Sequence, residues 1–235
     1  MRKIEVCLSP ELLHLYDLKG MTVVVVDILR ATSCMTAALA NGVSEIVPVS
    51  ELSECKKLKD NGYLTAAERN GEKVDGFDFG NSPYNYIDGD VSGRKLGITT
   101  TNGTLSINKS KNADQIVIGS FLNISRVVNY LKEGTNDVLI LCAGWKGQVN
   151  LEDTMFSGAV VEALIDDFEV EFDSTIIARN VYNASKENKF EYLKNSSHFK
   201  RLSKMGIEKD IKYCMNEDVF DVLPVMDGDV LINKK

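Results

Sequence analysis

A short apolar run is followed at once by side chains that could do chemistry. Val23–Val26 leads into Asp27, and Arg30 and Thr32 come within the next turn. In open α/β sheets, ligands bind beyond the carboxyl ends of the strands, where helix N-termini attract phosphate. Asp27 could instead cap the helix and pair with Arg30. Because burying a carboxylate at a valine strand is costly, we favour a functional role for both residues.

A long loop that contains several glycines carries a second group of polar residues. Glu68 and Arg69 follow the apolar stretch 64–67, and Asp78 and Asn81 come later in the loop. Loops that leave strand ends often carry binding and catalytic residues. A solvated loop explains the same composition equally well, so the loop alone does not decide between these interpretations.

Two further turns offer hydroxyl, amide and carboxylate groups. Thr101 and Asn102 follow a β-like stretch and could hold phosphate oxygens, or could simply form a tight turn before a helix. Glu152 and Asp153 lie in the first turn of another predicted helix. Mg²⁺ prefers oxygen ligands, so either acid could join Asp27 at a metal. Acids also favour helix N-termini through the helix dipole, which is the simpler explanation for either one alone.

Short β-rich runs alternate with segments of helical period, which is typical of an α/β protein with a largely parallel or mixed sheet. Continuous apolar runs indicate strands buried on both faces, as in a three-layer α/β/α sandwich. We predict strands at 3–8, 22–28, 45–49, 64–67, 95–99, 115–118 and 137–142, and helices at 31–40, 52–61, 103–108, 123–133 and 151–166. Short helices at 173–184, 186–194, 197–205 and 209–216 should pack on the sheet before a β-like end at 222–225 and 230–232. No linker or repeat interrupts this pattern, so residues 1–235 are predicted to form a single domain.

The overall charge excludes some classes of partner. Lys and Arg number 27 against 34 Asp and Glu, which gives a net charge of −7. Nucleic acid and anionic membranes would be repelled, so any positive potential must be local. The five scattered cysteines indicate neither disulfides nor zinc, and no apolar run reaches the length of a membrane span. These features predict a cytoplasmic protein.

Familiar phosphate-transfer motifs are missing. The chain has no G-x-x-x-x-G-K-[ST] loop, and Leu29 stands where an Asp-x-Asp nucleophile motif needs its second acid. His14 and His198 lie far apart and match no metal-binding motif, which argues against histidine-based chemistry.

Five motifs in order resemble the 2-phosphosulfolactate phosphatase family along nearly the whole chain. They read V-V-V-x-D-x-L-R-A-T-S, A-E-R-N-G, G-F-D-F-G-N-S-P, T-T-T-N-G-T and L-C-A-G-x-x-G-x-x-x-L-E-D. The resemblance implies Mg²⁺-dependent hydrolysis of a small sulfonated phosphomonoester, giving sulfolactate and phosphate, within coenzyme M biosynthesis. It also implies an α/β/α fold and a homodimer.

The resemblance further implies which residues form the site. We expect three catalytic residues, namely Asp27, Arg30 and Glu68. The expected substrate-binding residues are Arg30, Thr32, Arg69, Asn81, Thr101 and Asn102, and the expected Mg²⁺ ligands are Asp27, Asp78, Glu152 and Asp153. Guanidinium groups match phosphate and sulfonate oxygens, so the two arginines are expected to bind the substrate anions. The alternative is a protein that binds a small phosphorylated or sulfonated metabolite without turning it over.

Overall fold

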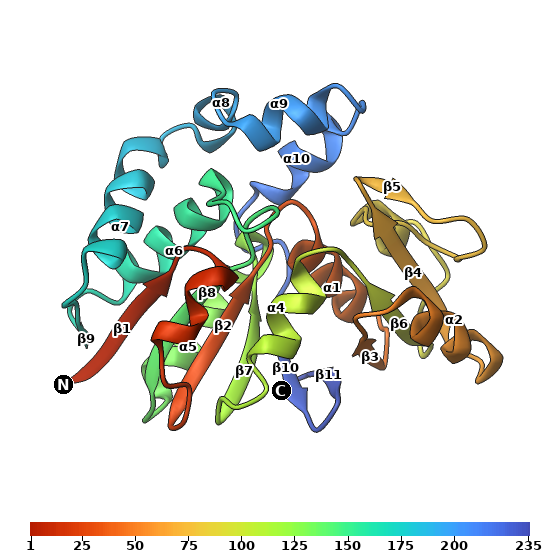
Figure 1. Ribbon diagram of the computed structural model, residues 1–235, viewed down its shortest axis with the longest axis horizontal. Coiled ribbons are helices and arrows are strands. Elements are labelled where there is room, and N and C mark those ends of the chain that lie inside the picture. Colours follow the sequence, from red (N-terminus) through yellow and green to blue (C-terminus); the bar gives the residue numbers. More distant parts are fainter.

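The backbone forms one long mixed sheet with helices on both faces. A computed structural model describes residues 1–235 (Figure 1). The sheet has 11 strands in the order β5-β4-β6-β3-β11-β10-β7-β2-β8-β1-β9. Their bounds are β1 Arg2–Cys7, β2 Met21–Val26, β3 Glu45–Pro48, β4 Leu64–Arg69, β5 Glu72–Lys73, β6 Lys95–Thr99, β7 Gln115–Gly119, β8 Asp137–Cys142, β9 Phe168–Glu169, β10 Pro224–Asp227 and β11 Val230–Asn233. The predicted α/β class with a mixed sheet is confirmed.

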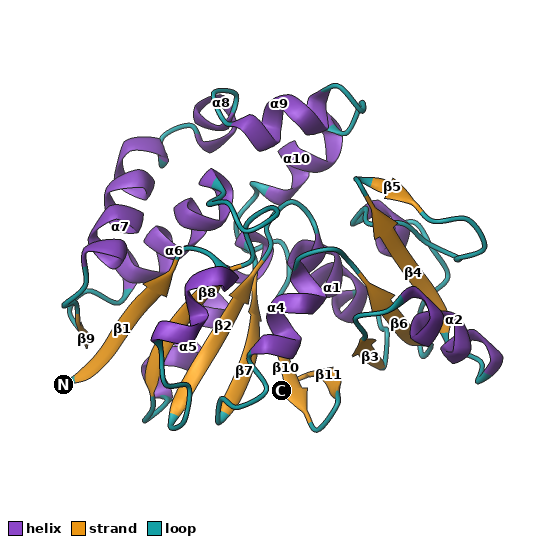
Figure 2. Ribbon diagram, in the orientation of Figure 1, coloured by secondary structure: helices purple, strands orange, loops and turns teal.

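Helices cover both faces of the sheet, as Figure 2 shows. The α-helices are α1 Ala31–Ala40, α2 Leu52–Asp60, α3 Tyr84–Ile87, α4 Gly103–Lys109, α5 Ile124–Glu133, α6 Leu151–Ala163, α7 Asp173–Ser185, α8 Lys189–Leu193, α9 Ser197–Ser203 and α10 Glu208–Cys214, with 3-10 turns η1 Pro10–Leu15 and η2 Phe121–Asn123. None of them combines the length and the apolarity that crossing a membrane requires.

The central strand β2 explains why the sheet needs two helical layers. Its residues Val23 and Val25 belong to an apolar core that includes side chains of η1, α1 and α4. Val24 and Val26 belong to a second core with α5, α6 and α7. Successive side chains of a strand point to opposite faces, so a run of four valines buries both faces at once. This strand therefore has to lie in the middle of the sandwich.

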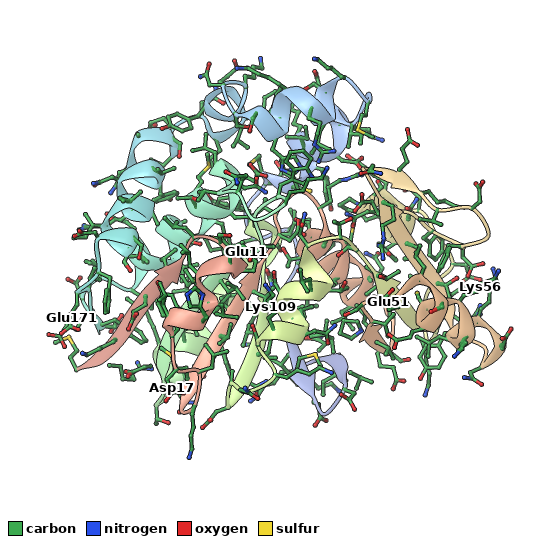
Figure 3. The ribbon with its side chains drawn as sticks, in the orientation of Figure 1. Glu11, Asp17, Glu51, Lys56, Lys109 and Glu171 are labelled. Atoms are coloured by element: carbon green, nitrogen blue, oxygen red, sulfur yellow. The ribbon has the colours of Figure 1, made fainter.

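Each helical layer contains a close contact between two of its elements. On one face, Lys109 of α4 lies 3.4 Å from Glu11 of η1, and both are labelled in Figure 3. On the other face, Gly158 lets α6 approach α7 closely, because a Cβ at this position would lie 2.0 Å from the Ala178 carbonyl oxygen. No larger side chain fits there without moving one of the two helices.

The antiparallel hairpin β10–β11 lies inside the sheet, where it joins two sets of strands. Strand β10 pairs with β7 at Val225 and Val117, while β11 pairs with β3 at Leu231 and Ile46. The core strands β1, β2, β7 and β8 are parallel to one another, as are β3, β4 and β6. The three antiparallel pairings through β10 and β11 reverse the strand direction between the two sets. The carboxyl ends of β2, β4 and β6 nevertheless meet, since Asp27, Glu68 and Thr101 line one pocket.

Candidate functional site

A polar pocket lies at the carboxyl ends of the parallel strands, where segments distant in sequence meet. The strand-end loops and α9 supply its walls. The lining residues are Asp27, Leu29, Arg30, Glu68, Asn70, Gly71, Asn81, Thr101, Asn102, Trp145, Lys146, His198, Arg201 and Leu202. This is the edge at which open α/β sheets bind ligands. Asp27, Arg30, Glu68, Asn81, Thr101 and Asn102, all expected from the sequence, are brought together here.

Asp27 is the carboxylate at the end of β2, and it is only 8% exposed. Burial raises its pKa to about 7; the neighbouring charge of His198 works against this rise, while Glu68 and Glu152 add to it. Gly103 packs against the same group, because a Cβ there would lie 3.0 Å from the Asp27 Oδ2. A carboxyl group in these surroundings is stabilised in its charged form by a nearby cation.

Arg30 also faces the pocket, and two contacts hold its guanidinium. Its Nη1 lies 2.5 Å from Asp210 Oδ2, and its Nη2 donates to the Gly71 carbonyl oxygen at 3.0 Å. The Nε of Arg30 is buried and has no hydrogen-bond partner. The pairing with Asp210 neutralises part of its charge, yet one donor remains for a bound group. Asp210 was not among the residues expected from the sequence.

Glu68 and Arg69 point in opposite directions because they are neighbours on β4. Glu68 is 9% exposed and accepts a hydrogen bond from the Gly71 N–H within the pocket wall. Arg69 instead bonds Thr99 Oγ1 at 3.1 Å and the Ser50 carbonyl oxygen at 3.3 Å, and it is not among the lining residues. The structure therefore gives Arg69 a role in joining strand ends, and substrate binding by it has no support in its placement.

Asp78 lies outside the pocket, and the protein occupies its oxygens. Lys59 Nζ donates to it at 2.8 Å, and the Thr65 N–H and hydroxyl both donate at 2.9 Å. Burial works to raise the pKa of Asp78, but these bonds outweigh it and the pKa is lowered. Its oxygens hold the loop 70–80 onto β4, which leaves none of them facing the pocket as a metal ligand would.

Asp153 ties two strand ends together from beneath the pocket. Its Oδ1 accepts from the Ile28 N–H at 2.9 Å and its Oδ2 from the Gly144 N–H at 3.0 Å. Burial raises its pKa well above the ordinary value, and the charges of Glu152 and Asp27 raise it further. Since both oxygens are engaged with backbone, Asp153 positions the ends of β2 and β8. The metal role expected for it is not supported by this placement.

Glu152 belongs to a buried chain of three side chains. It is fully buried, and its Oε1 contacts Nδ1 of His198, which is 7% exposed. The Nη2 of Arg201 lies 2.7 Å from Nε2 of the same imidazole. Arginine has only donors, so in the neutral imidazole Nε2 accepts from Arg201 and the ring proton sits on Nδ1, where it bonds Glu152. The sequence motif thus predicted a metal ligand at a position that instead orients a histidine.

Thr32 supports the site from behind without lining it. It is completely buried, and its Oγ1 accepts a hydrogen bond from the Asp27 N–H at 3.1 Å. The Thr32 N–H in turn bonds the Asp27 carbonyl oxygen at 3.0 Å. This pair of bonds fixes the turn between β2 and α1 and so the direction of Asp27. Contact between Thr32 and substrate, as expected from the sequence, has no support in this position.

Several buried polar atoms around the pocket have no partner in the protein. They are Arg30 Nε, Asn81 Oδ1, Arg201 Nε and, behind His198, Glu152 Oε2. Buried polar groups are normally hydrogen-bonded, and an unpaired group costs roughly 1–3 kcal/mol. Only two other buried side-chain atoms in the chain, in Tyr86 and Ser203, are unpaired. The concentration of unpaired donors and acceptors makes this pocket the best candidate for a polar ligand site.

The fit of Mg²⁺ can be judged from the oxygen atoms present. No group of three or more His, Cys, Asp or Glu side chains is arranged to hold a metal ion. Mg²⁺ typically uses one or two carboxylates and completes its shell with water and substrate phosphate. Asp27 and Glu68 supply two such carboxylates at the pocket, and Asn81 Oδ1 is an unpaired oxygen beside them. These groups fit Mg²⁺.

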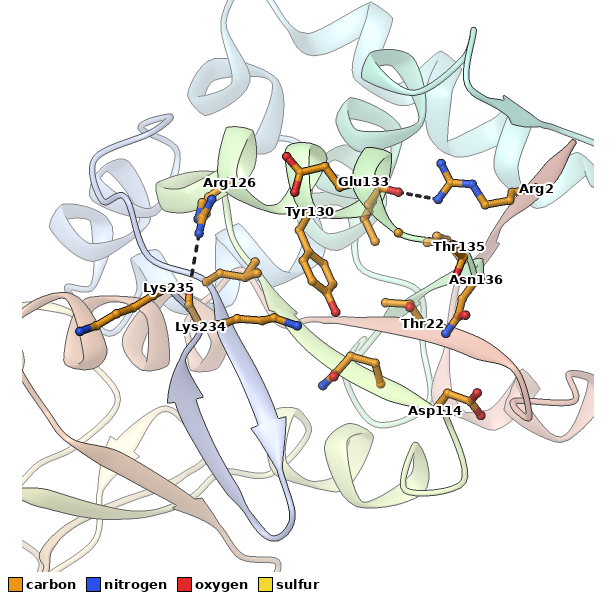
Figure 4. Close-up of a pocket in the computed structure, with 15 residues that line it drawn as sticks. Arg2, Thr22, Asp114, Arg126, Tyr130, Glu133, Thr135, Asn136, Lys234 and Lys235 are labelled. Carbon is orange, nitrogen blue, oxygen red and sulfur yellow. Dashed lines mark hydrogen bonds between the residues drawn. The ribbon is translucent and has the colours of Figure 1, made fainter.

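A larger hollow lies among residues at the opposite ends of the strands, as the close-up in Figure 4 shows. Its cavity volume is about 490 Å³, against about 30 Å³ for the polar pocket. Two of its cationic side chains donate to the backbone. Arg2 donates to the Leu131 carbonyl oxygen at 2.7 Å, and Arg126 donates to the Lys234 carbonyl oxygen at 3.4 Å. None of the unpaired buried atoms belongs to its lining residues. The unpaired polar atoms therefore favour the smaller pocket as the candidate site.

The model of the family described as 2-phosphosulpholactate phosphatase matches residues 7–229. The chain belongs to this family. Among relatives of the 2-phosphosulfolactate phosphatase family, a protein of Thermotoga petrophila is 41% identical over 91% of this chain and 92% of its own. One of Caldanaerobacter subterraneus subsp. tengcongensis is 38% identical over 92% and 91%. One of Clostridium acetobutylicum is 37% identical over 97% and 100%. All three are named probable 2-phosphosulfolactate phosphatase.

Membership of the 2-phosphosulfolactate phosphatase family makes the chain a phosphoric monoester hydrolase, as the five motifs indicated. Among the lining residues that sequence reasoning missed, three have basic side chains: His198, Arg201 and Lys146. His198 and Arg201 are three residues apart on α9, so they share one helix face. That spacing is the signal that could have found them. Motif matching set both histidines of the chain aside, since neither lies in a metal-binding pattern.

Proposed function

We propose that this protein is a Mg²⁺-dependent phosphatase that hydrolyses 2-phosphosulfolactate to sulfolactate and phosphate. The observation that carries the proposal is the pocket at the strand ends, in which two carboxylates, two arginines and several unpaired polar atoms converge. Family membership supplies the phosphatase class, and the names of the relatives supply the substrate. The protein is further proposed to act in coenzyme M biosynthesis as a homodimer, a proposal that rests on the family resemblance alone.

The carboxylates of Asp27 and Glu68, with Asn81 Oδ1, would hold the metal ion. When bound, Mg²⁺ offsets negative charge on the phosphoryl group and on the attacking and leaving oxygens. The raised pKa of Asp27 supports this assignment, because a cation beside a buried carboxyl favours its charged form. Thr32 keeps Asp27 directed at the pocket through the bond to the Asp27 N–H.

Arg30, Thr101 and Asn102 bind and orient the phosphate. Arg30 is fixed by Asp210 and Gly71, so its unpaired Nε is available to a phosphate oxygen without loss of side-chain freedom on binding. Thr101 and Asn102 face the same space from the end of β6 and offer hydroxyl and amide donors. Donors that are already oriented stabilise charge that develops in the transition state.

The proposal is tested by phosphate release from 2-phosphosulfolactate, measured with Mg²⁺ and after treatment with EDTA. We expect release only with the metal, and loss of at least about 100-fold in kcat for Asp27→Asn. Asp75→Asn is the matched control, since Asp75 is exposed in a loop and does not line the pocket. Release of no phosphate from this or any other small phosphomonoester would instead indicate a binding protein.

A further inference from the structure

Two basic side chains of the pocket have no acidic partner. Lys146 and Arg201 line the pocket, and neither forms an ion pair with any carboxylate of the chain. Both contact the ring of Trp145: the Lys146 Nζ lies 4.9 Å from its centroid and the Arg201 Cζ lies 4.8 Å from it. Arg30 differs, because Asp210 already neutralises part of its charge. The chain therefore keeps two unpaired positive charges next to one indole in a protein of net charge −7.

The loop that carries Lys146 is a tight and rigid hairpin. Trp145 and Gln148 exchange two backbone hydrogen bonds of 3.0 Å, which makes Lys146 and Gly147 the central residues of a two-residue turn. Their φ angles are 50° and 75°. Such a turn favours Asn or Gly at both central positions, and a lysine there costs conformational energy. Strain of this kind is typical of residues kept for their function.

Buried groups hold Arg201 in place against the ring of Trp145. The Nη2 of Arg201 donates to His198, which Glu152 orients from below. Its Nε is buried without a partner, so this guanidinium has a donor to spare. His198, which also lines the pocket, and Glu152 act as positioning residues, because their contacts fix the arginine.

We propose that Arg201 and Lys146, which both contact the ring of Trp145, bind the acid groups of the substrate other than its phosphate. This inference rests on the proposed phosphatase function, in which Asp27 and Arg30 act on the phosphoryl end. It predicts an enzyme selective for phosphomonoesters that carry a second acid group, such as a sulfonate or carboxylate. A planar guanidinium and an ammonium group together match the spread oxygens of such an anion.

The first test compares two substrates in the Arg201→Met variant. We expect KM for 2-phosphosulfolactate to rise roughly 10- to 100-fold, the usual loss for a hydrogen bond to a charged group. The kcat/KM for p-nitrophenyl phosphate, which has no second acid, should change less than about 3-fold. Lys200→Met is the control, because Lys200 is exposed on the same helix and bonds only the Asn195 carbonyl oxygen. Arg201→Lys should recover part of the selectivity.

The second test uses the turn and does not depend on Arg201. Replacing Lys146 by Gly removes the charge and relieves the strain, so the melting temperature should rise while KM for 2-phosphosulfolactate also rises. Lys146→Arg should keep the low KM. Calorimetric binding of sulfolactate, which contains no phosphate, should weaken in Lys146→Gly and in Arg201→Met, which gives a readout independent of turnover.

Equal losses on both substrates in Arg201→Met, or unchanged sulfolactate binding in both variants, would overturn the inference. Failure of the proposed function looks different. In that case the wild-type protein releases no phosphate from either substrate, whatever happens to sulfolactate binding.

Discussion

Asp27 is the best-supported residue of the candidate site, both in the sequence and in the structure. It ends a strand that is buried on both faces, and its burial, together with the nearby carboxylates, makes its charged form unfavourable until a cation is bound. Asp153 lies next to it and has a raised pKa from the same causes. Without a bound cation, ionisation of these two carboxyl groups therefore lowers the stability of the folded chain.

The pH dependence of stability follows from the raised pKa of Asp27. Its pKa is about 7 in the folded chain against 3.8 ordinarily. Between these values the unfolded chain loses the proton while the folded chain keeps it, so the contribution to stability is full below pH 4 and is lost as pH rises to about 7. In EDTA, Asp27→Asn should gain free energy of unfolding relative to wild type between pH 4 and pH 8. Urea titrations at both pH values measure this, with Asp75→Asn as the control. The same difference in free energy of unfolding between Asp27→Asn and wild type at pH 4 and at pH 8 would contradict this prediction.

Gly103 gives a steric prediction at the same spot. A Cβ added there would lie 2.6 Å from the Ala31 Cβ and 3.0 Å from the Asp27 Oδ2. Gly103→Ala should therefore destabilise the protein by about 1–3 kcal/mol, the usual cost of overpacking. The fall in kcat/KM for phosphate release should exceed what the loss of folded protein explains. Thermal unfolding and kcat/KM of one preparation measure both effects. Normal turnover in a folded variant would show that Asp27 tolerates displacement.

Only some of the pocket residues could be predicted from the sequence. Asp27 and Arg30 were predictable because they follow a run of four valines. Glu68 and Arg69 were indistinguishable in sequence, since only the pleat of β4 decides which one faces the pocket. The spacing of His198 and Arg201 on α9 was a weak signal, because Glu152, which orients His198, lies on α6 and is distant in sequence.

At the scale of elements, α10 holds Arg30 through an ion pair with Asp210. Asp210 lies 180 positions from Arg30 in sequence and is 9% exposed, and the two side chains meet at 2.5 Å. Removing one partner of a buried ion pair leaves the other charge uncompensated. The helical segment after β9 thus contributes to the site twice, through this pair and through the α9 residues of the pocket wall.

Asp210→Asn should accordingly lower the free energy of unfolding by about 3–5 kcal/mol and weaken phosphate binding. Glu208→Gln is the matched control, since Glu208 is exposed in the first turn of the same helix. Chemical denaturation and product inhibition by inorganic phosphate measure the two effects. Equal stability of both variants would mean that Arg30 finds another partner.

Elements with a strong local signal were predictable, and those made by pairing alone were not. All seven strands expected before residue 143 are present as β1, β2, β3, β4, β6, β7 and β8, and α1 matches its predicted range of 31–40. The two-residue strands β5 and β9 were missed, because such short pieces exist only through hydrogen bonds to β4 and β1. The hairpin β10–β11 was predicted, but its place inside the sheet depends on distant partners.

At the scale of the whole molecule, this hairpin is the only connection by strand pairing between the two sets of strands. Leu231 of β11 is fully buried opposite Ile46, and Val225 of β10 pairs with Val117. Leu231→Ala should cost about 2–5 kcal/mol, while Val230→Ala, at a half-buried position of the same strand, should cost less. Urea unfolding measures both. Similar losses at the two positions would argue against a packed joint here.

The same joint sets the order in which a newly made chain can become active. Asp27 and Glu68 belong to strands on opposite sides of the hairpin. A ribosome makes residues 224–233 after every other strand, so the two carboxylates are not locked into one sheet until almost the whole chain has emerged. A polypeptide cut short by early termination therefore lacks the joint that brings Asp27 and Glu68 into one sheet.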